Sequence, residues 1–358
     1  EAPIFTRSGY GEHSRFIYRA LRENIENLEV FVNALNWGTT SWTYSDSPEA
    51  HEMQHASERF LKYESACKEE GKPQSYDIQI HVGLPSEFEK KAGYSVCVTA
   101  GIETDKVSFE WLARTHRGID KIIVPSEHAA IGFRETNYEA INTNTNTKTQ
   151  LTCGCPVEVI PYPVKSLEKG TESLDIELLP DFNFLTVALL GPRKNLEKSV
   201  QLFIEEFREN PDVGLLIKTS TSRASLIDRA QTKGYLESLL DSCGPRKCKV
   251  YFLHGDLTDQ QMQLLYTHPK VKCYMTATRG EGYGLPIFES AYNGLPIIAT
   301  DWSGHLDFLI APYKDSKNKK EKNRKLFLKV DYTLEEVGPN AIWKDIIVEG
   351  SRWATIKE

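Results

Sequence analysis

Short apolar runs alternate with longer helix-forming stretches along this chain of 358 residues, and no other feature constrains the fold as strongly. Apolar runs of about four to eight residues are typical of strands buried on both faces, whereas apolar residues that recur at every third or fourth position are typical of helices. Strands and helices in alternation build βαβ units around a parallel sheet. The pattern therefore predicts an α/β protein.

Two series of strands are predicted, and the polar, acidic stretch 167–181 separates them. The first series comprises 3–6, 28–32, 76–82, 94–100, 121–125 and 157–161, and the second comprises 182–191, 214–219, 249–255, 271–277 and 296–301. A chain of this length suits two domains. We therefore predict Rossmann-like, doubly wound domains over 1–181 and 182–340, with 341–358 as a closing segment that runs back toward the first domain.

Charge and cysteine content narrow the class of protein. A net charge of −7 argues against nucleic acid as the main partner, because binding to a phosphate backbone normally needs a basic face. The seven cysteines are odd in number and scattered, which indicates a reducing cytosol and no disulfide framework. Apolar runs are far shorter than the roughly 18 residues of a membrane span. We expect a cytoplasmic protein, with at most peripheral contact with the inner face of a membrane.

Ligands of doubly wound sheets bind beyond the carboxyl ends of the strands, so the loops that follow strands are candidate site segments. In the first such loop Gly9 and Gly11 allow a tight turn and bring N–H groups close to a ligand at the start of a helix. A dinucleotide fingerprint would need a third glycine where Ser14 stands, which disfavours a nicotinamide-dependent enzyme. A plain tight turn is the alternative interpretation.

The second loop carries Arg193 and Lys194 directly after a strand and before a helix that Asn195 can cap. Lys218 ends the next strand, and carboxyl ends of parallel strands share one edge of the sheet. We therefore predict a cradle of cations for a diphosphate, although any one of the three on its own could be a solvated surface charge.

The third loop combines glycines with two carboxylates. Pro286 suits the first turn of a helix and Asn293-Gly294 suits its end, so a short helix is predicted over 285–293. Glu289 then lies inside the helix, whereas Glu281 lies in the glycine-rich loop ahead of it. Loop N–H groups can bind an anion and carboxylates accept hydrogen bonds from hydroxyls, so the segment suits a polyol attached to a phosphate.

These residues carry a resemblance to a known family. The segment EGYGLPIFE, from Glu281 to Glu289, resembles the E-x7-E signature of retaining glycosyltransferases with the GT-B fold, and in particular family four of these enzymes. Further segments resemble motifs of that family in the same order: SGYGEHSR at 8–15, DKIIVPSEHA at 120–129, GPRKN at 191–195, LHGDLTDQQMQLLY at 253–266 and GLPIIATDWSGHLDFL at 294–309.

The resemblance implies a hexosyltransferase that moves a sugar from a UDP- or GDP-sugar to a glycan, glycolipid or other hydroxyl acceptor with retained configuration, as in polysaccharide biosynthesis. It implies an acceptor-side first domain and a donor-binding second domain that face each other across a cleft. It also implies neither cofactor nor metal, and no Asp-x-Asp motif occurs in the chain.

Roles follow from the resemblance position by position. Arg193 and Lys194 would neutralise the diphosphate, with Lys218 as a further cation, and Glu281 would contact hydroxyls of the donor sugar. Glu289 would hold the ribose. The other donor-binding positions are Gly9, Gly11, Gly282, Tyr283, Gly284 and Leu285.

Histidines are the remaining candidates in the first domain. His116 stands where relatives often place a sugar-contacting residue, and His13 and His81 are candidates for the acceptor side. Glu103 follows a strand and is a further acceptor-side candidate. For each of these four residues, a packed or solvated side chain without a function is the alternative.

The basic run 314–325 leaves two interpretations open, a solvated loop and a docking site for an anionic membrane or acceptor. Two other functions also remain open for the whole chain. A sugar-nucleotide-binding protein without catalysis would keep the phosphate cradle, and so would a GT-B relative such as a sugar-nucleotide epimerase.

Overall fold

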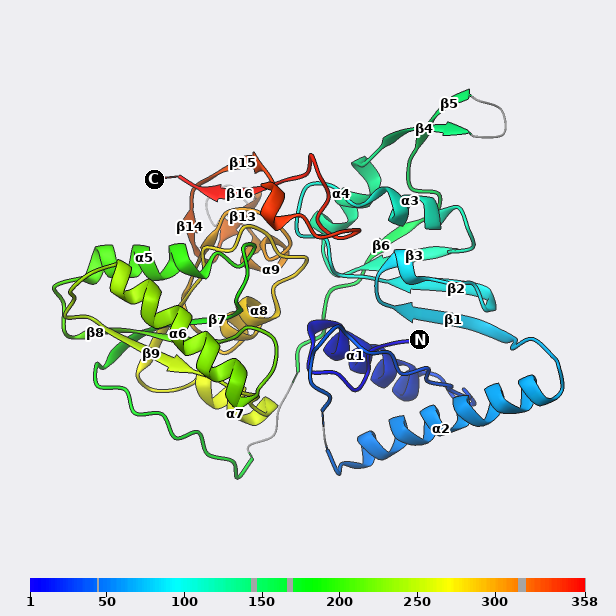
Figure 1. The fold of residues 1–358 in the computed structure, drawn as a ribbon, viewed down its shortest axis with the longest axis horizontal. Coiled ribbons are helices and arrows are strands. Elements are labelled where there is room, and N and C mark those ends of the chain that lie inside the picture. The colour runs from blue at the N-terminus through cyan, green and yellow to red at the C-terminus, as the bar shows by residue number, and fades with distance from the viewer. Residues whose placement is uncertain (44, 143–146, 166–169, 315–319, 358) are drawn as a thin grey trace. The chain divides into compact units, whose positions relative to one another are not determined.

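A computed structural model describes the chain except for residues 44, 143–146, 166–169, 315–319 and 358 (Figure 1). The described residues form two compact units. The N unit comprises 1–163 and 342–348, and the C unit comprises 164–341 and 349–358. Each unit is built on a parallel sheet, as the alternation of strands and helices predicts.

The described part of the N unit contains a four-stranded parallel sheet in the order β1-β2-β3-β6. Its strands are β1 (Tyr76–Val82), β2 (Ala92–Val98), β3 (Lys121–Val124) and β6 (Val157–Val159). The helices are α1 (Gly9–Asn24), α2 (Pro48–Glu69), α3 (Phe109–Thr115) and α4 (Glu127–Glu135), with a short 3-10 helix η1 (Pro85–Glu87). A hairpin of β4 (Tyr138–Asn142) and β5 (Thr147–Leu151) follows α4.

The predicted strands at 3–6 and 28–32 are wrong as regular strands. In this region of the described chain there are only isolated bridges, a parallel one from Ala2 to Ala34 and an antiparallel one from Thr6 to Trp42. The N-terminus still runs parallel to β1, because the Glu1 amino group donates to Ile80 O at 3.0 Å and Val82 N donates to Glu1 O at 2.9 Å. Pro3 has no N–H group, so the pairing cannot continue as a full ladder.

The described part of the C unit contains a six-stranded parallel sheet in the order β14-β11-β10-β7-β8-β9. Its strands are β7 (Phe182–Leu189), β8 (Val213–Ser220), β9 (Lys249–Leu253), β10 (Val271–Met275), β11 (Ile297–Thr300) and β14 (Leu328–Val330). The helices are α5 (Leu196–Phe207), α6 (Leu226–Ser242), α7 (Asp259–Tyr266), α8 (Leu285–Tyr292) and α9 (Leu306–Leu309). All the strands predicted for the second series are present, with ends shifted by a few residues.

The order of strands in the C unit determines where a ligand can bind. The chain proceeds from β7 outward to β8 and β9, and then returns to the other side of β7 with β10 and β11. The strand order therefore reverses between β7 and β10. Ligands of doubly wound sheets bind at such a switch point, outside the carboxyl ends of the strands.

Both faces of this sheet are covered by apolar side chains. One core contains Leu196, Val200, Phe203 and Ile204 of α5, and the core of the other face contains Leu265 and Ile287 from α7 and α8. The sequence predicts that 164–181 belong to the first domain, but the structure assigns them to the C unit. Leu174, Ile176 and Leu178 bury their side chains against the core of the C unit, on the α7–α8 side of its sheet.

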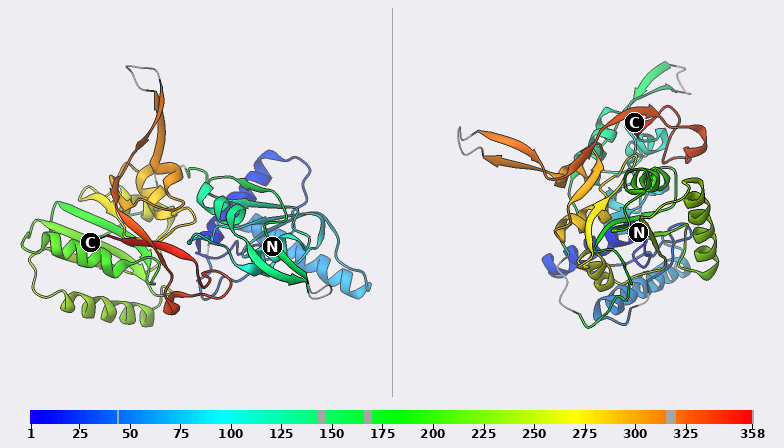
Figure 2. Two further views of the ribbon diagram at one scale, coloured as in Figure 1. Left: turned by 90° about the horizontal axis from the view of Figure 1, so that it is seen from above. Right: turned by 90° about the vertical axis from the view of Figure 1, so that its left-hand side faces the viewer.

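Two antiparallel ribbons and a 3-10 helix, η2 (Pro339–Ala341), complete the C unit. β12 (Ile310–Lys314) pairs with β13 (Glu321–Lys325) in an arm that extends away from the sheet (Figure 2). β15 (Tyr332–Glu336) pairs with β16 (Arg352–Ile356) at the end of the chain.

Candidate active site

The loops after β7, β10 and β11 meet at the carboxyl edge of the C-unit sheet. Arg279 N donates to Arg193 O at 2.8 Å, and this bond joins the loop after β10 to the loop after β7. Gly304 N donates to Glu281 O at 2.9 Å and joins the loop after β11 to the same segment. The switch point is therefore lined by three loops with defined positions relative to one another.

Glu281 lies at the centre of these loops. Its side chain is 8% exposed, and its carboxylate binds Lys194 Nζ at 2.6 and 2.8 Å and Arg193 Nη1 at 3.0 Å. Thr278 Oγ1 donates a further hydrogen bond of 2.9 Å. Burial alone would raise the pKa of Glu281, but the charges of Lys194 and Arg193 and the hydrogen bonds lower it from 4.5 to about 2. The carboxylate is therefore ionised at neutral pH.

Two cations meet one carboxylate in this cluster. Among the described residues, Glu281 contributes one negative charge and its two cationic partners contribute two positive charges. The side chains of Arg193 and Lys194 are 22% and 17% exposed, so both remain partly accessible to solvent. The cluster can therefore attract an anion while Glu281 stays in place.

The structure brings Arg193, Lys194 and Glu281 together, and Lys218 lies two residues before the end of β8, the strand beside β7. Lys218 is in β8, in register with Val187 of β7. Asn195 is the N-cap residue of α5, as predicted, but its side chain makes no capping hydrogen bond and its φ is left-handed, at 50°. Its side-chain amide instead donates to Ala277 O at 3.1 Å and so connects the loops after β7 and β10.

The glycine-rich segment leads into α8 as predicted. Gly284 has a φ of 93°, which favours glycine, and α8 starts at Leu285 with Pro286 in its first turn. The Tyr283 ring points into the protein and packs on Phe288 and Phe308. Only the backbone of Tyr283 is therefore available to a ligand at this edge.

Glu289 has a different environment from Glu281. It is half-buried inside α8, and Tyr266 OH donates to Glu289 Oε2 at 2.8 Å. Tyr266 is completely buried, and burial together with the Glu289 charge raises the pKa of its phenol well above 10. The two carboxylates of the motif therefore differ in that Glu281 binds two cations and Glu289 accepts a hydrogen bond from a buried phenol.

The sequence did not predict the residues that support these carboxylates. Thr278 and Tyr266 bind Glu281 and Glu289, and Ser303 accepts a hydrogen bond of 2.9 Å from Glu281 N. His305 lies behind Ser303, with 3.3 Å between His305 Nδ1 and Ser303 Oγ. In the sequence, these residues stand out only because they follow strands or lie in the segments that resemble the glycosyltransferase family.

Gly9 and Gly11 lie inside α1 and not in a loop ahead of it. Ser8 caps the helix by accepting a hydrogen bond of 2.9 Å from Gly11 N. A Cβ atom at Gly11 would lie 2.1 Å from Thr6 O, so only glycine fits at this position. Close packing against the preceding turn is therefore sufficient reason for Gly11, whether or not a ligand also binds there.

His13 and His81 are both buried in the N unit. The His13 ring contacts Tyr162 edge-on at 4.5 Å between centroids, and burial lowers the pKa of His13 to about 4. His13 Nδ1 has no hydrogen-bond partner among the described residues. The two ring nitrogens of His81 lie 3.3 Å from Glu1 Oε2 and 3.3 Å from Leu84 O, which is typical of a structural histidine.

His116 lies at the opposite edge of the N-unit sheet from the start of α1. It follows α3 and precedes β3, and its Nε2 is 2.8 Å from Thr152 O. A residue that precedes a parallel strand lies at its amino end, whereas ligands bind at carboxyl ends. Glu103 does follow β2 at the carboxyl edge, where Tyr10 OH of α1 accepts hydrogen bonds from Ala100 N and Gly101 N.

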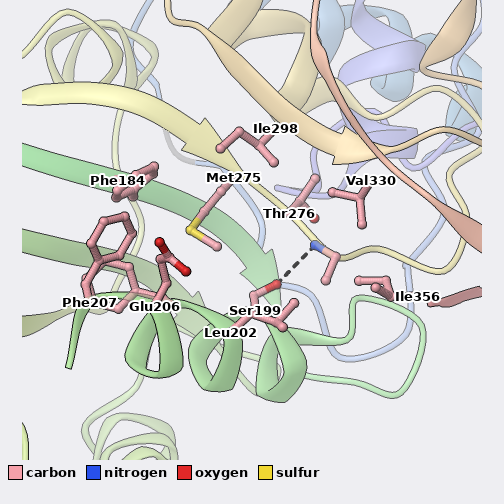
Figure 3. Close-up of a pocket in the computed structure, with 12 residues that line it drawn as sticks. Phe184, Ser199, Leu202, Glu206, Phe207, Met275, Thr276, Ile298, Val330 and Ile356 are labelled. Carbon is pink, nitrogen blue, oxygen red and sulfur yellow. Dashed lines mark hydrogen bonds between the residues drawn. The ribbon is translucent and has the colours of Figure 1, made fainter. Parts of the chain in front are cut away.

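An apolar pocket of about 250 Å³ lies beside α5 in the C unit (Figure 3). Side chains of Leu202, Phe207, Met275 and Ile298 line it, and Ala277 N donates to Ser199 Oγ at 3.0 Å at its edge. Its lining holds no pair of acidic and basic groups. We therefore place the candidate active site in the loops around Glu281.

Two curated proteins are similar to part of the chain. The mannosyltransferase WbdA of Escherichia coli is 28% identical over 121 residues, which are 33% of this chain and 13% of WbdA. The GtfA subunit of a UDP-N-acetylglucosamine–peptide N-acetylglucosaminyltransferase of Streptococcus pneumoniae is 26% identical over 144 residues, which are 40% of this chain and 25% of GtfA. The matches thus span a quarter or less of these relatives, and no family model matches the chain.

Among solved structures, sucrose-phosphate synthase from Thermosynechococcus elongatus has a similar fold, with a TM-score of 0.50 and 15% sequence identity. The similarity covers 90% of this chain and 80% of the synthase. Together with the two parallel sheets, it confirms the predicted α/β fold of the GT-B type. In the described part of the chain, no helix is both long enough and apolar enough to cross a membrane.

Proposed function

We propose that this protein is a glycosyltransferase that uses a nucleotide-diphosphate sugar as its donor. One observation carries the proposal: a buried, ionised Glu281 binds Arg193 and Lys194 at the switch point of a Rossmann-like sheet. This arrangement offers cations to a diphosphate and a carboxylate to sugar hydroxyls. The sequence relatives support it, because both are named as sugar transferases.

The finer assignment is a retaining, metal-independent hexosyltransferase of GT-B family four that acts from a UDP- or GDP-sugar on a glycan, glycolipid or other hydroxyl acceptor. GtfA is named for a UDP-linked donor, which favours a UDP-sugar as the donor here. In this assignment the C unit binds the donor and the N unit contributes to the acceptor side. His13 and Glu103 are the N-unit residues that we assign to the acceptor side.

Charge development during the reaction explains the proposed roles. When the bond between the anomeric carbon and the phosphate oxygen breaks, negative charge develops on the departing diphosphate. Arg193 and Lys194 would stabilise that charge, and so would backbone N–H groups at the start of α8. Glu281 would accept hydrogen bonds from the sugar, and Glu289 from the ribose.

For retention we propose front-face attack, in which the acceptor attacks from the side on which the diphosphate leaves. The acceptor oxygen forms a bond with the anomeric carbon as the phosphate oxygen departs. That phosphate oxygen then takes the proton of the acceptor hydroxyl, so that no protein base is needed. The role of the protein is to orient the donor and to neutralise the leaving group.

A donor panel tests this proposal. The protein is incubated with UDP-, GDP- and ADP-sugars, with and without glycan and glycolipid acceptors, and the released nucleotide is measured. We expect one UDP- or GDP-sugar to release its nucleotide, and to do so faster with a suitable acceptor. Tight nucleotide binding without release would favour a binding protein, and conversion of the donor sugar without release would favour an epimerase.

We also propose that the ribbon of β12 and β13 contacts an anionic membrane surface at the inner face of the cell. The register pairs Tyr313 with Lys322 and Ala311 with Arg324, so these side chains share one face of the ribbon. Tyr313 is exposed, and exposed aromatic and basic side chains on one face suit the headgroup region of a bilayer.

Binding to vesicles tests the contact. We expect the double variant Lys322→Glu/Arg324→Glu to bind less than the wild type to vesicles that contain phosphatidylglycerol, and binding to fall with added salt. Lys233→Glu/Lys247→Glu, at two exposed positions of the same unit, is the charge-matched control. Equal loss in both variants would show that only net charge matters.

A further inference from the structure

We propose that Ser303, Gly304 and His305, in the loop after β11, form a positioning element that holds the backbone of Glu281 for catalysis. The inference rests on the proposed function, since it names residues that act on the same site. None of the three residues is assigned a contact with the donor. They act through Glu281 and are positioning residues.

A chain of hydrogen bonds runs from Glu281 into the core of the C unit. Glu281 N donates to Ser303 Oγ at 2.9 Å, Ser303 Oγ lies 3.3 Å from His305 Nδ1, and His305 Nε2 lies 2.7 Å from Thr300 O. A carbonyl only accepts, so Nε2 carries the proton. Nδ1 of the neutral ring must then accept from the Ser303 hydroxyl, and all donor and acceptor directions are determined.

The backbone of this loop supports the same segment from a second side. Gly304 N donates to Glu281 O at 2.9 Å, so both the N–H and the C=O of Glu281 are bound by adjacent residues. A Cβ atom at Gly304 would lie 2.2 Å from Gly282 O, so no larger residue fits there. The contact between the two loops therefore depends on glycine.

Ser303 has an unusual conformation in this contact. Its φ is 92°, in the left-handed region that favours glycine, and its side chain is buried. A serine held in such a conformation needs compensation from its surroundings. The hydroxyl supplies it here, because it is the group that links Glu281 to His305.

His305 is completely buried and neutral. Burial lowers its pKa, whereas its hydrogen bond to Thr300 and the nearby carboxylates of Glu281 and Asp301 act in the opposite direction, and Lys194 opposes protonation. A protonated ring would lose its acceptor at Nδ1. The chain of hydrogen bonds therefore depends on the neutral form.

The substitution Ser303→Gly separates positioning from folding. Glycine relieves the left-handed φ, so the variant should fold with an unchanged melting temperature, but the acceptor for Glu281 N is lost. Asn27→Gly, at an exposed residue of the N unit with a φ of 58°, is the matched control. We expect hydrogen exchange of the 279–284 segment to become faster in Ser303→Gly and to stay unchanged in Asn27→Gly.

Kinetics of the same variants give the functional test. We expect kcat of Ser303→Gly to fall at least about tenfold, because small displacements of catalytic groups cost much of the rate. The Kd for UDP should stay within about twofold, since UDP lacks the sugar that Glu281 is proposed to contact. His305→Asn, which keeps an acceptor near Nδ1, should retain more kcat than His305→Leu.

Unchanged hydrogen exchange in Ser303→Gly would overturn the inference, whatever the activity. Faster exchange with unchanged kcat would also overturn it, because the contact would then have no role in catalysis. A wild-type protein that turns over no donor would instead refute the proposed function and, with it, the catalytic part of this inference. Hydrogen exchange alone would still decide whether Ser303 holds Glu281.

Discussion

Replacing Glu281 with glutamine removes one charge from the candidate site and leaves the shape of the side chain unchanged. The pKa of Glu281 is lowered from 4.5 to about 2 in the folded protein, which corresponds to about 3 kcal/mol of stability. Because the folded pKa lies below the unfolded value, this stabilisation is complete above about pH 4.5. It is lost as the pH falls through about 2.

Glu281→Gln should therefore lower the free energy of unfolding by about 3 kcal/mol at pH 7, and the difference from the wild type should shrink below pH 4. Turnover should fall at least about tenfold, since a hydrogen bond to a charged group is worth about 1.5 to 3 kcal/mol. UDP should bind at least as tightly as to the wild type, because the site gains one net positive charge.

Urea unfolding between pH 3 and pH 7, together with calorimetric titration of UDP, measures these effects. Glu209→Gln is the control, because Glu209 and Lys247 form an exposed ion pair, with side chains 73% and 64% exposed, and such pairs contribute about 1 kcal/mol or less. Equal stability of Glu281→Gln and the wild type at pH 7 would refute the argument. So would weaker binding of UDP by the variant.

Two further predictions concern Gly11 of α1 and Glu289 of α8. Gly11→Ala should destabilise the protein by about 3 kcal/mol, because its Cβ atom would overlap Thr6 O. Gly234→Ala in α6 should not, because its Cβ atom would meet nothing within 4 Å outside the backbone of its own helix. Thermal unfolding compares the two variants, and equal melting temperatures would contradict the packing argument. Glu289→Gln should raise the Kd for UDP about tenfold. It should leave the binding of inorganic pyrophosphate unchanged, because pyrophosphate lacks the ribose. Calorimetry measures both affinities, and an equal loss of affinity for the two ligands would refute the ribose assignment.

Local signals in the sequence were sufficient for most strands of the two parallel sheets and for the placement of the two carboxylates. The apolar runs predicted β7 to β11 of the C-unit sheet but not β14, and Pro286 with Asn293-Gly294 predicted α8. Glu281 ahead of the helix and Glu289 within it follow from that local reading. Such signals work because strand and helix periodicity, and the backbone limits of proline and glycine, act over a few neighbouring residues.

Only the tertiary structure decided which side chains act on one another. Arg193 and Glu281 are 88 residues apart and form an ion pair because β7 and β10 are neighbours in the sheet. The topology of the N-unit sheet places His116 at its amino edge, away from its carboxyl edge. Electrostatic and packing contacts depend on distance in space, so strand order and loop geometry determine them. The sequence therefore did not show that Ser303 binds Glu281 and lies against His305. Nor did it show why only glycine fits at position 11.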